Sequence, residues 1–62
     1  MIFKILLLEH EGTCESLYST EEKASEAWEK TREKSNIIMR VLMVLKDGRW
    51  WLLQSNTTAP EI

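Results

Sequence analysis

Two strongly apolar runs joined by Asp47-Gly48 dominate the second half of this chain, in residues 41–54, VLMVLKDGRWWLLQ. An Asp-Gly pair between apolar runs is the strongest short-range signal for a β-hairpin. A type I′ turn needs a positive φ at both central residues, and glycine adopts it without steric cost. The segment therefore predicts a hairpin with strands over residues 37–46 and 49–54.

The length of the hairpin loop decides which side chains face each other. A two-residue loop pairs Lys46 with Arg49 and Leu45 with Trp50, whereas a three-residue loop with a bulge pairs Leu45 with Arg49. The first register places like charges opposite each other, at a modest energetic cost. The sequence leaves both registers open, and with them the question of whether Trp50 or Trp51 faces the core.

The first half of the chain predicts two strands and a helix. Residues 1–9, MIFKILLLE, indicate a strand that is apolar on both faces, and residues 14–19, CESLYS, indicate a short returning strand. Residues 20–34 predict a helix because they lack proline and glycine and are rich in Ala, Glu and Lys. Either Ser19 or Thr20 can serve as its N-cap.

The predicted fold is α+β with the element order β-β-α-β-β: a small, mostly antiparallel sheet with one helix packed on one face. Residues 1–55 are expected to form a single domain, followed by a flexible polar tail over residues 56–62. A chain of 62 residues buries only about 60% of the surface that its unfolded form exposes. The single Cys14 excludes an internal disulfide, so self-association or a metal would have to supply further stability.

The predicted strands carry more apolar surface than one helix can cover. A sheet with one wet face should alternate apolar and polar residues, and these strands do not. The uncovered face is expected to hold Leu6, Leu8, Leu42, Val44, one of the two hairpin tryptophans, and Leu52 or Leu53. Several hundred Å2 of such surface represents on the order of 10 kcal/mol of transfer free energy, so we expect it to be buried. The sequence predicts a homodimer or higher oligomer, or docking of another protein, without indicating which face or edge is used.

The candidate partner-binding residues lie at the hairpin. Aromatic residues and arginine dominate the energetics of protein interfaces. The predicted site comprises Trp50, Trp51, Arg49 and Lys46, with Leu53 as part of the apolar patch. These residues indicate a non-enzymatic binding protein. The alternative is a nucleotide or single-stranded nucleic-acid binding protein, because cations and aromatics combine in this way where bases stack.

Other functions have weaker support in the sequence. The formal net charge of −2 lacks the positive field that binds duplex DNA. His10 and Cys14 have no third group to orient them as a catalytic pair, so no enzymatic activity is expected and no role is assigned to either residue. In a strand His10 would point away from Glu9 and Glu11, which argues against a metal site, and no cofactor is expected. No signal peptide or membrane span is recognisable, which predicts a soluble cytoplasmic protein.

Residues 6–30, LLLEHEGTCESLYSTEEKASEAWEK, resemble a recurrent pattern in small uncharacterised proteins of phages and bacteria. The pattern is a strand ending in acidic and His residues, a turn, and a helix that begins after Tyr-Ser-Thr with Glu-Glu-Lys-Ala. It carries no catalytic residues. The resemblance implies a phage-type accessory protein in the host cytoplasm that binds and inhibits or modulates a host protein, for example a defence factor.

Overall fold

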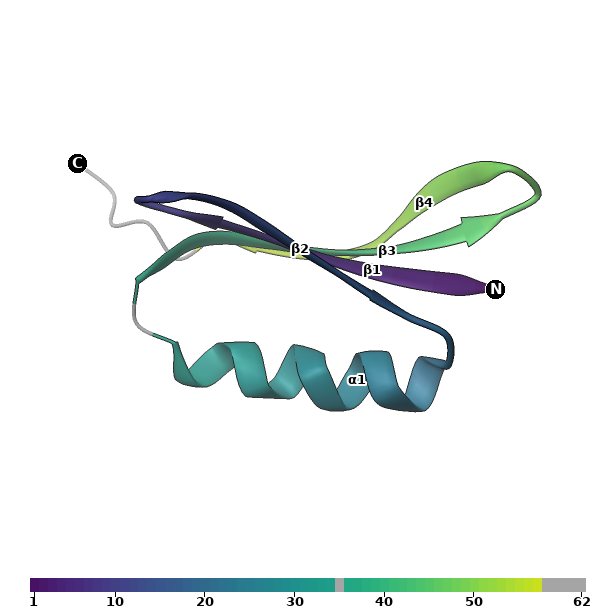
Figure 1. The fold of residues 1–62 in the computed structure, drawn as a ribbon, viewed down its shortest axis with the longest axis horizontal. Coiled ribbons are helices and arrows are strands. Elements are labelled where there is room, and N and C mark those ends of the chain that lie inside the picture. The colour runs from purple at the N-terminus through teal and green to yellow at the C-terminus, as the bar shows by residue number, and fades with distance from the viewer. Residues whose placement is uncertain (35, 58–62) are drawn as a thin grey trace.

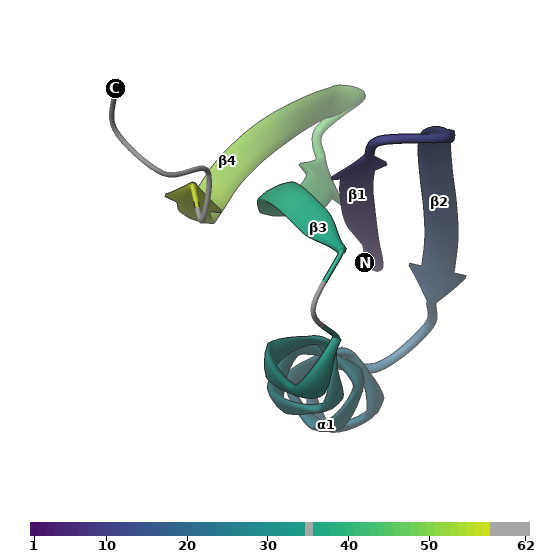
Figure 2. The same ribbon diagram turned by 90° about the vertical axis from the view of Figure 1, so that its left-hand side faces the viewer.

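The structure is a computed structural model that describes residues 1–34 and 36–57. Its elements are β1 (Ile2–Glu9), β2 (Gly12–Tyr18), α1 (Glu21–Lys30), a 3₁₀ turn η1 (Thr31–Glu33), β3 (Ile37–Lys46) and β4 (Arg49–Thr57). The strands form one antiparallel sheet (Figure 1), and Figure 2 shows their order, β2-β1-β3-β4. The helix α1 lies on one side of this sheet (Figure 2). The predicted α+β class is confirmed.

The hydrophobic core lies between α1 and the face of the sheet that α1 covers, here called the helix-side face. The sheet contributes alternate residues of β1 and β3, and α1 contributes one small and one large side chain. The buried apolar residues of the core are Phe3, Ile5, Leu7, Ala24, Trp28, Ile37, Leu42 and Val44. As the large anchor of α1, Trp28 is only 5% exposed, and Ala24 lets the helix approach the sheet closely.

Two residues expected on the uncovered face are in the core instead. The register between β1 and β3 pairs Phe3 with Val44 and Ile5 with Leu42, so both β3 residues share the face of the odd-numbered β1 residues. The prediction for Leu42 and Val44 was therefore wrong. Because β3 is apolar at both odd and even positions, its sequence gave no signal for which set faces α1.

The opposite face of the sheet, here called the open face, is defined by the same registers. Its described residues alternate with those of the helix-side face along each strand. The open face consists of Ile2, Lys4, Leu6, Leu8, Thr13, Glu15, Leu17, Met39, Val41, Met43, Leu45, Trp50, Leu52, Ser55 and Thr57. Leu6 and Leu8 were correctly expected there. Most of this surface is apolar, and no described helix covers it (Figures 1 and 2).

The start of α1 is capped by Thr20, one of the two residues that the sequence allowed. Thr20 has extended backbone angles, and its Oγ1 accepts a hydrogen bond from the backbone N of Lys23 at 3.2 Å. Glu21 follows in the first turn, where a carboxylate is favoured by the helix dipole. The cap directs the chain from the end of β2 back across the helix-side face.

A buried arginine of β3 packs against the C-terminal end of α1. Arg40 of β3 is 5% exposed, and its Nη1 donates a hydrogen bond to Thr31 Oγ1 at 2.9 Å. The Thr31 hydroxyl in turn donates to the Trp28 carbonyl at 2.6 Å, and the guanidinium carbon of Arg40 lies 5.3 Å from the centroid of the Trp28 ring. Arg40 Nε is buried and has no hydrogen-bond partner among the described residues. The charge is thus held by the carboxyl end of a helix and by an aromatic face.

The last strand is longer than predicted. β4 reaches Thr57, whereas the sequence indicated an end at Gln54, so Asn56 and Thr57 pair with β3 instead of belonging to a tail. The remaining tail residues, 58–62, lie outside the described residues.

The pairing of β3 with β4 contains a β-bulge. The register shifts where Met43 pairs with Leu52 and Leu42 with Gln54, which leaves Leu53 as the extra residue of the bulge.

Candidate partner-binding surface

The hairpin turn has the two-residue form. Asp47 and Gly48 both have positive φ, 54° and 73°, as a type I′ turn requires. The register pairs Lys46 with Arg49, and it pairs Val44 with Trp51. Of the two registers that the sequence left open, the structure has the one that places the two cations opposite each other.

The predicted site residues divide between the two faces of the sheet. Trp51, Lys46 and Leu53 line a cavity on the helix-side face, and the pairing of Arg49 with Lys46 places Arg49 on that face as well. The fifth residue, Trp50, pairs with Leu45 on the open face. The hairpin therefore presents one tryptophan to each surface.

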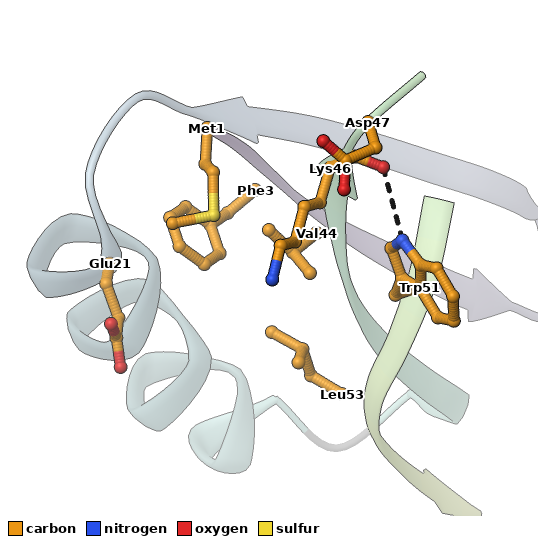
Figure 3. A pocket seen from close by; sticks show the side chains of 8 residues that line it. All are labelled: Met1, Phe3, Glu21, Val44, Lys46, Asp47, Trp51 and Leu53. Atoms are coloured by element: carbon orange, nitrogen blue, oxygen red, sulfur yellow. Dashed lines mark hydrogen bonds between the residues drawn. The ribbon is translucent and has the colours of Figure 1, made fainter. Parts of the chain in front are cut away.

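A cavity of about 480 Å3 lies beside the hairpin, between the first turn of α1, the start of β1 and β4 (Figure 3). We call it the hairpin cavity. Its lining is mostly apolar and comes from three parts of the chain: the N-terminal residues, the start of α1 and the β3–β4 hairpin. The lining residues are Met1, Phe3, Glu21, Val44, Lys46, Asp47, Trp51 and Leu53. Pockets that bind small molecules have volumes of about 300–1,000 Å3.

The indole of Trp51 is held in place at the wall of this cavity. Its Nε1 donates a hydrogen bond to the backbone carbonyl of Lys46 at 3.2 Å, drawn as a dashed line in Figure 3. Because this bond satisfies the polar atom of the ring, the remainder of the side chain offers apolar surface. Trp51 is nevertheless 48% exposed and Leu53 52% exposed. The cavity is therefore an open apolar surface, incompletely filled by the chain itself.

The charges at the rim of the cavity are of both signs. Glu21 and Asp47 contribute carboxylates, and Lys46 contributes an ammonium group. Arg49, paired with Lys46 across the hairpin, adds a second cation nearby. The rim therefore lacks the single-sign field that would concentrate a strongly charged ligand.

Trp50 occupies a different environment. The ammonium group of Lys4 lies 4.1 Å from the centroid of the Trp50 ring, a cation–π contact across β3. Lys4 Nζ also lies 3.8 Å from Glu15 Oε2. Trp50 is thus turned over the open face and takes no part in the hairpin cavity.

The residues without an assigned role lie at the far end of the sheet. His10 is in the turn between β1 and β2, and Cys14 is an exposed free thiol in β2. Cys14 lines a shallow hollow with Glu9 and Glu11, and His10 is not among the residues of that hollow. Within residues 1–34 and 36–57, no group of three or more His, Cys, Asp or Glu side chains could hold a metal ion.

Several cavity residues could not be predicted from the sequence. Met1 precedes β1, Phe3 lies in β1 and Glu21 begins α1, and only the tertiary arrangement brings them beside β4. Val44 was misplaced on the uncovered face. Arg40, which does not line the cavity, did carry a signal: it is a charge within the apolar run IIMRVLMVL, which points to a residue with a specific environment.

No described helix is long and apolar enough to cross a membrane. A comparison of the chain with protein-family models, with curated proteins and with solved structures found no match.

Proposed function

We propose that this chain is a non-enzymatic binding protein that receives an apolar side chain of a partner protein in the hairpin cavity. The observation that carries the proposal is the cavity of about 480 Å3, whose wall is formed by the half-exposed side chains of Trp51 and Leu53. Filling it would remove apolar surface of both proteins from water. A fixed aromatic wall beside an open apolar space is the usual setting of an interface hot spot.

The rim indicates what kind of partner segment fits. The apolar floor, formed by Phe3 and Val44, suits a leucine, methionine or aromatic side chain. Around it, Glu21 and Asp47 can accept hydrogen bonds, whereas Lys46 can donate them. A partner segment with one large apolar residue flanked by charges of both signs would match this pattern.

A nucleotide or a single nucleic-acid strand is the alternative ligand. It is favoured by the presence of Trp51, Lys46 and Arg49 on the same face of the hairpin. The carboxylates of Glu21 and Asp47 line the same cavity, and they would repel phosphate groups. This arrangement supports a protein partner over a nucleic acid.

The class of partner rests on the resemblance of residues 6–30 to small phage and bacterial proteins. By that resemblance the chain is an accessory protein in the host cytoplasm, and its partner is a host protein that it inhibits or modulates. The proposed role is therefore inhibition by occupation of a surface, with no reaction catalysed by this chain.

The proposal can be tested by site-specific crosslinking followed by a binding measurement. A photoreactive amino acid in place of Leu53 should capture a partner from a host lysate, and the same group in place of the exposed Glu29 should not. The captured protein is identified, purified and titrated calorimetrically. Trp51→Ala is expected to raise the Kd by at least about tenfold, because it removes the wall of the cavity, and Trp51→Phe by less.

Glu29→Ala serves as the matched control and should leave the Kd unchanged. An unchanged Kd for a folded Trp51→Ala protein would exclude the hairpin cavity as the binding site. Quenching of tryptophan fluorescence by AMP or oligo-dT, abolished by Trp51→Ala, would replace the proposal with the nucleotide-binding alternative.

A further inference from the structure

The open face is a mostly apolar surface to which all four strands contribute. Leu17 on β2 and Leu52 on β4 mark its two margins, and they are 59% and 62% exposed. Ile2 and Leu8 on β1 are 42% and 40% exposed. Monomeric proteins rarely leave more than a few hundred Å2 of contiguous apolar surface in water. Something other than α1 is therefore expected to cover this face.

The charges of the open face are already paired with each other. Among its described residues, Lys4 and Glu15 are the charged ones, and they lie 3.8 Å apart. The same ammonium group lies 4.1 Å from the centroid of the Trp50 ring. The face therefore has no net charge, and it offers no unpaired charge that would select an oppositely charged partner. A surface of this kind is complementary to another neutral apolar surface.

The edges of the sheet are less suited to self-association than its face. Along the β4 edge, the bulge at Leu53 interrupts the regular pairing, and bulges of this kind protect edge strands from adding a further strand. Along the β2 edge, Glu15 lies at the centre of the strand. A charged residue in that position also disfavours edge pairing.

The size of the open face matches the requirement of a stable dimer. Four strands spaced about 4.8 Å apart, each with about eight residues at roughly 3.4 Å per residue, span a plane of about 500 Å2. The accessible area of the side chains that project from such a plane is larger than the plane itself. A standard interface buries about 800 Å2 per partner, so a contact over the whole face is of the right magnitude.

We propose that the open face packs against the open face of a second copy of this chain, forming a sandwich of two four-stranded sheets with α1 on each outer surface. A second copy has the same twist, and twisted sheets pack face to face at about 10 Å and within about 30° of alignment. Met39 and Met43 contribute flexible side chains that can adapt to the opposing sheet. This dimer goes beyond the proposed function, because the hairpin cavity opens on the other side of the sheet and stays accessible.

The test compares substitutions at two neighbouring residues of β4. Leu52 and Leu53 have similar exposure, 62% and 52%, but only Leu52 belongs to the open face. Sedimentation equilibrium of the full chain, whose monomer mass is 7.3 kDa, is expected to give a dimer. Leu52→Lys should raise the dimer dissociation constant at least tenfold, and Leu17→Lys combined with Leu52→Lys at least a hundredfold. Leu53→Lys should leave it unchanged and should weaken binding of the partner protein instead.

The mode of association is read independently from the wild-type protein by NMR of an isotopically mixed sample. Intermolecular contacts are expected between methyl groups of Leu6, Val41 and Met43, at the centre of the open face. A monomer at millimolar concentration would overturn the proposal, as would intermolecular contacts between backbone amides of β4, which indicate edge pairing. An equal effect of Leu52→Lys and Leu53→Lys would also overturn it. None of these outcomes depends on whether the hairpin cavity binds a partner.

Discussion

At the scale of single residues, Arg40 holds a full positive charge inside the core without a carboxylate in contact among the described residues. Its contacts are the Thr31 hydroxyl, 2.9 Å away, and the face of Trp28. Both groups belong to the last part of α1 and η1, where the helix dipole is negative. A charge in so dry a position depends strongly on each of these partners, since water cannot replace them.

Removing the Thr31 hydroxyl should therefore lower the free energy of unfolding more than removing the Arg40 charge itself. Thr31→Val is expected to lower the free energy of unfolding by about 1–3 kcal/mol, because it leaves the Arg40 guanidinium and the Trp28 carbonyl without their shared partner. Arg40→Met, which fills a similar volume without a charge, should be neutral or stabilising. Urea denaturation at one fixed protein concentration measures both.

The double variant provides the control for this prediction. In the Arg40→Met background, Thr31→Val should lower the free energy of unfolding by less than it does in the wild-type protein, because no buried cation is left unpaired. Equal costs in the two backgrounds would show that the Arg40–Thr31 hydrogen bond does not couple these residues.

At the scale of elements, the β3–β4 hairpin depends on its two-residue turn. Gly48 has φ +73°, and a Cβ placed there would meet no atom of the described residues within 4 Å. The cost of Gly48→Ala is therefore backbone strain alone, about 1–2 kcal/mol in the free energy of unfolding. Asp47→Asn, at φ 54°, should be tolerated because asparagine accepts this conformation. Thermal denaturation of the two variants at equal concentration tests the difference.

The hairpin also shows what could and could not be predicted from the sequence. The turn was predictable because its cause is local: Asp47-Gly48 adopts the backbone angles that a type I′ turn needs. The orientation of β3 was not, because both of its faces are apolar, and Leu42 and Val44 were assigned to the wrong side. The bulge at Leu53 has no local signature in the sequence, although it shapes one wall of the hairpin cavity.

The boundaries of the elements likewise separate into those with a local cause in the sequence and those set by tertiary pairing. Thr20 was one of two candidate caps, and its hydrogen bond to Lys23 N confirms that a side-chain cap begins the helix. The extension of β4 to Thr57 was missed because Ser55, Asn56 and Thr57 are polar, whereas their pairing with β3 comes from the length of the opposite strand. Local rules predicted the elements, and tertiary pairing set their limits.

At the scale of the whole molecule, the proposed dimer couples stability to concentration. Only eight apolar residues form the buried core among the described residues, a small number for an independent fold. If two chains share a second core between their open faces, the thermal midpoint should rise with protein concentration, since association stabilises the folded state by mass action. The midpoint of the Leu17→Lys/Leu52→Lys protein should be lower and independent of concentration. A wild-type midpoint that is constant over a hundredfold range of concentration would contradict the dimer.

The alternation of β4 has a practical consequence for optical studies of this protein. The three tryptophans of the protein occupy three separate environments. Trp28 lies in the core, Trp50 lies over Lys4 on the open face, and Trp51 lies at the hairpin cavity. Variants that retain one indole and carry phenylalanine at the other two positions would each emit from a single, known location. The chain thus contains intrinsic reporters that can separate folding, self-association and partner binding in the same spectrometer, without any attached dye.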